Sequence, residues 1–145
     1  IANRGFYYIP HVIKRIDNDT IPAKFSKKHH TSIDPQHFKI VIDGMEQVLE
    51  NIDGTAFMSK VKGISICGKT GTAENPHGDD HSIFIAFAPK ENPEIAIAVY
   101  VENGGWGSTW AAPIGSLMIE KYLRNTITNT EQEAFILNGN LIKNK

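Results

Sequence analysis

The residues whose types and spacing best fit a binding or catalytic role lie in one run near the middle of the chain. Gly63, four intervening residues and Gly68-Lys69-Thr70 match the spacing of a phosphate-binding P-loop. A P-loop needs a flexible glycine-rich turn and a helix that begins at the lysine. Here the intervening Ile64-Ser65-Ile66-Cys67 alternates apolar with small polar residues, which is typical of a half-buried strand. Since Gly71-Thr72-Ala73 cannot readily begin a helix, nucleotide binding is the weakest of the hypotheses considered for this run.

As a strand, the same run has a different chemistry. Alternation places Lys69 and Gly71 on one face and Thr70 and Thr72 on the other. A lysine and two hydroxyl groups make a positive, hydrogen-bonding strand edge, and the glycine lets another backbone or a ligand approach closely. Such an edge suits a carboxylate-bearing peptide laid alongside as an added strand. An ordinary exposed strand end remains an equal alternative on these four residues alone.

Two amphipathic helices are predicted from apolar periodicity. Asp34-Pro35 marks a helix start, because aspartate can accept backbone N–H bonds and proline suits the first helical position. Asp53-Gly54 ends this helix. A second helix is expected to be capped by Ser108 or Thr109 and to end near Arg124. The apolar stripes consist of Phe38, Val41, Ile42, Met45, Val48, Leu49 and Ile52 in the first helix, and Ala112, Ile114, Leu117, Met118, Tyr122 and Leu123 in the second.

Three strands are predicted between these helices, over residues 64–74, 83–88 and 95–101. The run at 83–88 is continuously apolar, which predicts a central strand covered on both faces. The short connections make the strands antiparallel, because a parallel pair would need a long crossover. Shorter β-like runs occupy residues 6–9 and 11–16. Strands joined by turns, with helices before and after them, predict the α+β class: an antiparallel sheet flanked by helices.

Composition excludes several classes of protein. The 145 residues are 41% hydrophobic and 21% charged, as in an ordinary globular domain. A net charge of -1 creates no general field that would attract nucleic acid, so no nucleic-acid partner is expected. The lone Cys67 cannot close a disulfide within the chain, and a small buried thiol is the preferred interpretation. No apolar run approaches the roughly 20 residues of a membrane-spanning helix.

One compact cluster carries side chains that can bind metals. His77, Asp79, Asp80 and His81 occur within five positions of one another. Their order matches no recognised ligand spacing, and glycine and aspartate dominate turns. A turn is therefore the preferred interpretation, and neither a metal nor another cofactor is predicted.

Lys69-Thr70-Gly71 on a strand is also one of three signature motifs of penicillin-binding proteins and serine β-lactamases. Its surroundings strengthen the likeness. Residues 68–74, 83–89 and 97–105 together resemble the C-terminal part of the transpeptidase domain of class B penicillin-binding proteins, in particular the elongation-type cell-wall enzymes. Residues 1–11 resemble the stretch that follows the family's middle motif.

The resemblance implies a domain organisation as well as a fold. Residues 1–124 would be the C-terminal portion of a transpeptidase domain of the penicillin-binding-protein and serine β-lactamase type. Residues 125–145 would be a polar C-terminal tail, with a short helix near residues 131–137. The opening Ile1-Ala2-Asn3-Arg4-Gly5 looks like the last turn of a helix, with Asn3 and Gly5 as residues able to end it, so a piece of a longer protein is expected.

The resemblance further implies the activity of a D,D-transpeptidase. A serine attacks the penultimate D-Ala carbonyl of a peptidoglycan stem peptide, releases the last D-Ala and passes the acyl group to an amine; β-lactams acylate the same serine. By position, Lys69 adds positive charge near the middle motif's serine, and the hydroxyls of Thr70 and Thr72, around Gly71, hold the substrate carboxylate. The backbone N–H of Thr72 would be one oxyanion-hole donor.

The same resemblance implies partners and a location. The missing N-terminal part of the domain would complete the active site, and a membrane glycosyltransferase of the cell-elongation machinery would work beside it. The location implied is the periplasmic face of the bacterial inner membrane.

The chain departs from the family in the motif that carries the nucleophile. Ser-x-x-Lys occurs only at Ser59-Lys60-Val61-Lys62, in a polar stretch with no helix start, which indicates an accidental match. The family's middle serine motif is not found in a usable place. This chain alone is therefore predicted to be inactive, because acylation needs a positioned nucleophile and its base. A non-catalytic module that binds peptides or carboxylates on the same scaffold is the second hypothesis.

Overall fold

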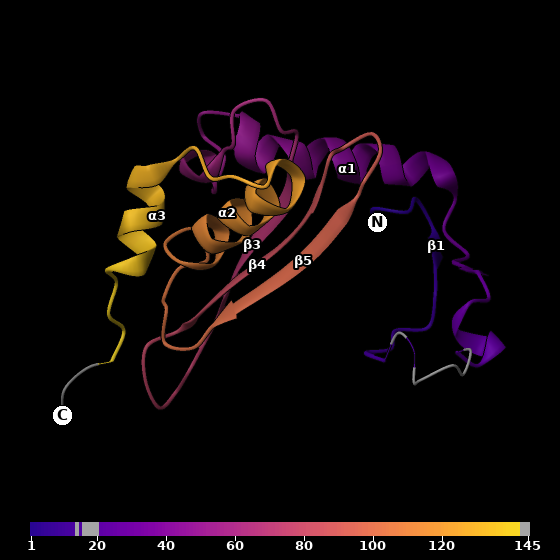
Figure 1. The fold of residues 1–145 in the computed structure, drawn as a ribbon, viewed down its shortest axis with the longest axis horizontal. Coiled ribbons are helices and arrows are strands. Elements are labelled where there is room, and N and C mark those ends of the chain that lie inside the picture. Colours follow the sequence, from indigo (N-terminus) through magenta and orange to yellow (C-terminus); the bar gives the residue numbers. More distant parts are fainter. Residues whose placement is uncertain (14, 16–20, 143–145) are drawn as a thin grey trace. The chain divides into compact units, whose positions relative to one another are not determined.

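The computed structural model describes residues 1–13, 15 and 21–142 (Figure 1). The chain divides into two compact units, Ile1–Val41 and Ile42–Lys145, and each is described by itself. The second unit contains the Lys-Thr-Gly run and most of the secondary structure.

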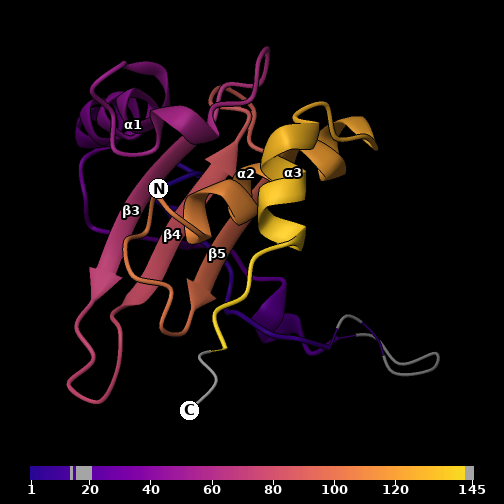
Figure 2. The ribbon, with the colours of Figure 1, turned by 90° about the vertical axis from the view of Figure 1, so that its left-hand side faces the viewer.

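The second unit is built around a three-stranded antiparallel sheet. Its strands are β3 (Cys67–Ala73), β4 (His81–Ala88) and β5 (Ile95–Val101), in the order β3-β4-β5. Figure 2 shows the three strands side by side, with β4 in the centre and β3 at one edge. The predicted antiparallel order and the α+β class are confirmed. The first strand begins at Cys67 rather than Ile64, because Ile64 belongs to a turn that is closed by its N–H bond to the carbonyl of Val61.

Helix α2 (Ala111–Arg124) covers one face of this sheet and packs on β4 and β5. The predicted N-caps, Ser108 and Thr109, are wrong. The first backbone N–H of the helix instead donates to the hydroxyl of Ser82, at 3.0 Å, and that hydroxyl donates to the carbonyl of Trp106, at 2.9 Å. A strand residue therefore caps the helix, which joins the start of α2 directly to the sheet.

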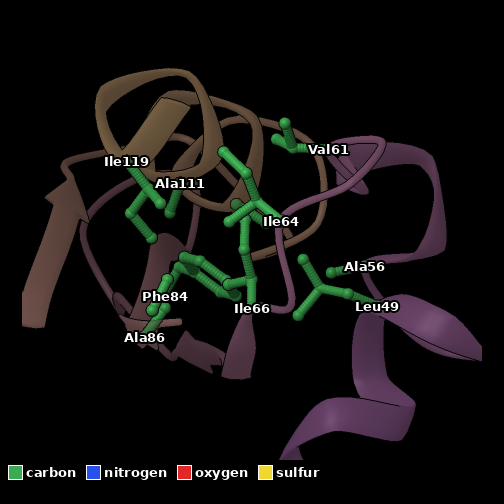
Figure 3. Close-up of a cluster of buried hydrophobic side chains, with 11 residues drawn as sticks. Leu49, Ala56, Val61, Ile64, Ile66, Phe84, Ala86, Ala111 and Ile119 are labelled. Atoms are coloured by element: carbon green, nitrogen blue, oxygen red, sulfur yellow. The ribbon is translucent and has the colours of Figure 1, made fainter. Parts of the chain in front are cut away.

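The core of the second unit includes the side chains packed between the sheet and α2, among them Phe84 (Figure 3). The ring of Phe84 is fully buried and occupies space that two glycines leave open. A Cβ atom added at Gly68 of β3 would lie 2.6 Å from this ring, and one at Gly115 of α2 would lie 2.7 Å from it. The buried cluster consists of Leu49, Ala56, Val61, Ile64, Ile66, Phe84, Ala86, Ala88, Ala111, Ala112 and Ile119.

The other face of the sheet is covered only in part, since Phe87 on β4 and its partner Cys67 on β3 are buried. Within the described part of the second unit, Ile85 on β4 is 45% exposed and Tyr100 on β5 is 56% exposed. Met118 and Tyr122, placed in the packed stripe of the second helix, are exposed as well. A continuous apolar run indicates a strand that can be buried on both faces. It does not show that helices or loops of the same chain pack along the whole of each face.

Helix α1 (Pro35–Glu50) begins as predicted, since the N–H of Gln36 donates to the Asp34 carboxylate at 3.0 Å. It ends at Glu50, three residues before Asp53, and Ile52 is exposed in the turn that follows. The predicted stripe is correct for its buried members and wrong for Val41 and Ile52. The buried members are Phe38, Ile42, Met45 and Leu49, with Val48 partly buried.

Lys90, in the turn between β4 and β5, ties this turn to α1. Its Nζ lies 2.8 Å from Asp43 Oδ1 and 2.7 Å from Glu46 Oε2. The Ser65 hydroxyl donates to the other oxygen of Glu46, at 3.1 Å, so the approach to β3 joins the same network. The hydrogen bond to Asp43 makes the largest contribution and the one to Glu46 the next, and together they raise the pKa of Lys90 well above its ordinary value of 10.5.

This raised pKa predicts a change in alkaline stability. The Lys90 ion pairs stabilise the folded state fully below about pH 10.5, and the contribution is lost as the pH rises toward the raised pKa. Wild type and Lys90→Met should therefore differ in free energy of unfolding by a constant amount between about pH 6 and pH 10, where the carboxylates are ionised, and by less above pH 10.5. Urea titrations across this range measure the difference. The Asp43→Asn variant should weaken the pH dependence, and equal slopes in all three proteins would contradict the assignment.

The first unit contains a two-stranded antiparallel pair, β1 (Phe6–Tyr7) and β2 (His29–His30). The predicted strand at residues 6–9 is thus shorter than expected. The β-like run at 11–16 is wrong for residues 11–13 and 15, and its remaining two positions lie outside the described residues. The left-handed residues of the opening turn are Arg4 and Gly5, so Gly5 but not Asn3 matches the prediction.

Residues 125–142 include the predicted short helix, α3 (Thr130–Leu137). Asn129 caps it by accepting a bond from the N–H of Gln132, at 3.0 Å. The ring of Phe135 stacks on Trp110 at a centroid distance of 5.1 Å, which holds α3 beside α2. No helix in the described residues is both long enough and apolar enough to cross a bilayer.

Candidate functional site

The Lys-Thr-Gly run lies on β3, and no helix begins at its lysine. The P-loop hypothesis is therefore wrong, because the lysine and its neighbours are extended instead of forming a turn that leads into a helix. β3 pairs with β4 along one side, and no other strand of the described residues pairs with its second side. The run consequently lies at an open sheet edge, the position required for a ligand to add as a further strand.

The register of the sheet confirms the predicted alternation along β3. Thr70 and Thr72 lie opposite Phe84 and Ser82, so their side chains share the face that α2 covers. Lys69 lies opposite Ile85 and is exposed on the other face. Thr70 is half-buried and Thr72 is exposed, so neither hydroxyl is sealed in the core.

The ammonium group of Lys69 turns back toward the strand. Its Nζ donates to the carbonyl oxygen of Thr70 at 2.7 Å, which holds the positive charge close to the β3 backbone. An exposed lysine that points away from the sheet would place the charge several ångströms from any ligand on the strand edge. Here the charge and the threonine hydroxyls belong to the same short length of strand, which suits an anionic group on an extended ligand.

The Gly71 backbone is approached closely by another part of the chain, but it is Gly107 that lacks room for a side chain, since a Cβ atom at Gly71 itself would meet only Ile83, at 3.4 Å. A Cβ atom at Gly107 would lie 2.5 Å from the Gly71 carbonyl oxygen and 2.4 Å from that of Ile83. The loop between β5 and α2 therefore packs directly on the backbones of β3 and β4. Glycine-rich sequence at 104–107 suggested a loop, but its contact with β3 becomes visible only in the folded chain.

A second hydroxyl, which sequence reasoning missed, lies beside the run. Thr55 Oγ1 is 2.8 Å from Thr70 Oγ1. Thr55 follows the end of α1 in a polar stretch that carried no recognisable pattern. The one available signal is Gly54, a glycine in the turn after the helix, and it locates the next residue only once the helix itself has been placed.

His77, Asp79 and Asp80 lie in the connection between β3 and β4, as predicted, and His81 is the first residue of β4. The Asp80 carboxylate accepts a bond from the N–H of Asn75 at 3.2 Å, and the Asn75 side chain donates to that of Asn103 at 2.9 Å. His81 Nδ1 accepts a bond from the N–H of Asn103 at 3.1 Å. Among the residues that the structure describes, no three His, Cys, Asp or Glu side chains come together as a metal site.

Neither serine match elsewhere in the chain forms the family's serine site within the described residues. Ser59, the first residue of the Ser-x-x-Lys match, is 1% exposed in the short 3-10 helix Phe57–Ser59, so its hydroxyl cannot reach a substrate. A Ser-x-Asp triplet also occurs, at Ser32-Ile33-Asp34, where the aspartate serves as the N-cap of α1. The burial of Ser59 supports the interpretation of the Ser-x-x-Lys match as accidental, whereas the Ser32-Ile33-Asp34 triplet was missed in the sequence analysis.

Comparison with known proteins shows which families this chain resembles in sequence. The profile of the penicillin binding protein transpeptidase domain matches residues 1–120. PbpA of Mycolicibacterium smegmatis, a peptidoglycan D,D-transpeptidase, is 35% identical over 141 residues, which cover 86% of this chain and 27% of PbpA. MrdA of Escherichia coli, also a peptidoglycan D,D-transpeptidase, is 28% identical over 137 residues, which cover 81% of this chain and 21% of MrdA. The chain thus spans about a quarter of the length of these curated relatives.

Solved structures agree with the sequence comparisons. The fold is similar to that of PBP2 of Pseudomonas aeruginosa in complex with WCK 5153, with a TM-score of 0.73 and 34% identity over 89% of this chain and 29% of that one. It is also similar to penicillin-binding protein A of Mycobacterium tuberculosis in its imipenem acyl-enzyme complex, with a TM-score of 0.66 and 30% identity over 85% of this chain and 28% of that one. Sequence, register and fold lead to one conclusion: the chain belongs to the penicillin-binding-protein transpeptidase family.

Proposed function

We propose that this chain supplies the Lys-Thr-Gly side of the active site of a serine D,D-transpeptidase that cross-links peptidoglycan. The observation that carries the proposal is the open edge of β3, where Lys69, Thr70 and Thr72 lie extended and reachable. The relatives named above are peptidoglycan D,D-transpeptidases, and the match extends over most of this chain. A penicillin-binding protein A among the structural neighbours forms acyl-enzymes with β-lactams.

Each residue of the run has a separate role in this proposal. The extended stem peptide, or a β-lactam that resembles it, lies along β3, with its carboxylate on the hydroxyls of Thr70 and Thr72. The Lys69 ammonium stabilises the negative charge near the reacting serine. The N–H of Thr72 donates to the oxygen that becomes negative as the serine attacks the carbonyl. Donors fixed in place before the reaction begins are effective because no reorganisation is needed when the charge develops.

The nucleophile belongs to a segment outside these 145 residues. Ser59 is buried and Ser32 lies beside a helix cap, so neither offers the serine and base that acylation requires. The 27% coverage of PbpA leaves ample sequence in such a protein for the other motifs. Residues 1–145 alone are accordingly proposed to be inactive, and the rest of the same domain is the first partner of this chain.

The proposed cellular location and partners rest on the family to which the chain belongs. The relatives act on peptidoglycan, so the proposed location is the periplasmic face of the bacterial inner membrane, with a membrane glycosyltransferase of the elongation machinery as the enzyme that supplies glycan strands. PBP2 of Helicobacter pylori forms a complex with MreC, which supports the proposal that such proteins assemble with other proteins.

Labelling of the full-length protein with a fluorescent penicillin tests the proposal. We expect one covalent adduct per molecule, which an excess of unlabelled penicillin prevents, and mass spectrometry of the labelled peptide should place the adduct on a serine outside residues 1–145. No adduct on folded protein would favour a non-catalytic module that binds peptides or carboxylates. An adduct on Ser59 would contradict the assignment of the nucleophile.

A further inference from the structure

The hydroxyl of Thr55 is held against the proposed carboxylate-binding group. Thr55 Oγ1 and Thr70 Oγ1 are 2.8 Å apart, a normal distance for a hydrogen bond between two hydroxyls. Fifteen residues separate the two threonines, so the pair depends on the fold and not on local chain geometry. Thr55 is exposed and Thr70 is half-buried, which leaves the pair accessible to a ligand at the open edge of β3.

Both neighbours of Thr55 fix its position. On one side, Gly54 lies so close to the last turn of α1 that a Cβ atom there would be 2.4 Å from the Val48 carbonyl oxygen. On the other side, the N–H of Ala56 donates to the same carbonyl at 3.0 Å, and Ala56 is 1% exposed in the core. The segment is therefore clamped to the end of α1, and Thr55 meets Thr70 in a geometry that exists before any ligand arrives.

The direction of the hydrogen bond decides what Thr70 can do. Each threonine hydroxyl has one proton to donate and can accept further bonds. If Thr70 donated to Thr55, it would have no proton for an anion. If Thr55 donates to Thr70, the Thr70 proton stays free, and a hydroxyl that accepts one bond becomes a better donor to the next acceptor.

We infer that Thr55 is a positioning residue for carboxylate recognition: its hydroxyl donates to Thr70 Oγ1 and directs the Thr70 proton to the carboxylate of the substrate or β-lactam. This inference rests on the proposed function, because it needs Thr70 to bind that carboxylate. It assigns to the segment between α1 and β3 a part in substrate selection that its sequence does not reveal. Thr55 contacts no reacting atom and acts through Thr70 alone.

The test compares a β-lactam that has a free carboxylate with the methyl ester of the same compound, in acylation of the full-length protein. Thr55→Val should slow acylation by the free acid about three- to tenfold, as expected for one hydrogen bond, and leave the rate with the ester unchanged. Thr55→Ser, which keeps the hydroxyl, should restore most of the loss. Thr126→Val, at an exposed threonine outside the site, is the control. Equal slowing with both compounds would show a merely structural role and overturn the inference.

Adding Thr70→Val separates this inference from the proposed function. If Thr70→Val slows acylation by the free acid and Thr55→Val has no further effect in that background, the two hydroxyls act as one unit, as inferred. If Thr70→Val slows the reaction and Thr55→Val alone does not, the role of Thr55 is wrong and the function stands. If Thr70→Val has no effect with the free acid, the carboxylate assignment itself fails, and the role of Thr55 fails with it.

Discussion

Replacing Lys69 with methionine is expected to slow acylation of the full-length protein by a β-lactam by about 100- to 1,000-fold, the range seen when one preorganised group in an active site is removed. The structure holds the Lys69 ammonium against the β3 backbone, 2.7 Å from the Thr70 carbonyl oxygen, so its charge has a defined place on the strand edge. Methionine keeps the unbranched chain except for its last atom and removes the charge. Stopped-flow measurement of the acylation rate gives the effect directly.

Lys62 offers a matched control for the Lys69 prediction. It is an exposed lysine on the segment that leads into β3, and its backbone carbonyl, which accepts a bond from Arg124, is unaffected by a change of side chain. Lys62→Met should acylate at nearly the wild-type rate. Comparable losses in the two variants would indicate a general effect of net charge and would remove the specific role of Lys69. A wild-type rate for Lys69→Met would contradict the site.

The second large effect is on stability. Phe84→Ala should lower the free energy of unfolding by about 3–5 kcal/mol, as is typical when a buried aromatic ring is truncated. The ring lies between Gly68 and Gly115, and neither glycine has a side chain that could move into the cavity. Because β3 and α2 both pack against this ring, its loss should also loosen the strand that carries Lys69. Urea denaturation of the full-length protein measures the change.

Ile52→Ala is the comparison for Phe84→Ala. Ile52 is 76% exposed in the turn after α1, so its truncation should change the free energy of unfolding by less than about 0.5 kcal/mol. A small effect at Phe84 together with a large effect at Ile52 would mean that the core of the second unit has been placed wrongly.

Much of the fold could be predicted because its signals are local. The apolar runs at β4 and β5, the Asp34-Pro35 start of α1 and the short turns between strands all act over a few residues. Those signals were enough for the antiparallel order, since a connection of a few residues permits no other arrangement. The ends of the elements were less certain, and the first strand and first helix were each misplaced by three residues at one end.

Predictions failed where the outcome depended on contacts with distant parts of the chain, which local sequence patterns do not contain. Ser108 and Thr109 have the right chemistry for an N-cap. In the folded chain, however, the Ala111 N–H at the start of α2 donates to the hydroxyl of Ser82 on β4. Val41 and Ile52 fit the apolar period of α1, yet burial depends on what packs against each position and not on the period itself. Ser59 likewise had the right spacing to Lys62, but it is buried and lacks the exposure that a nucleophile requires.

For the candidate site, sequence alone was sufficient to choose Lys69, Thr70, Gly71 and Thr72 and to place the threonines on one face, because side-chain alternation is a property of any regular strand. Tertiary structure alone decided that β3 is an edge strand, that the loop carrying Gly107 packs on Gly71, and that Thr55 meets Thr70. Such contacts join residues far apart in sequence, and they form only when the helices and the sheet pack around a common core.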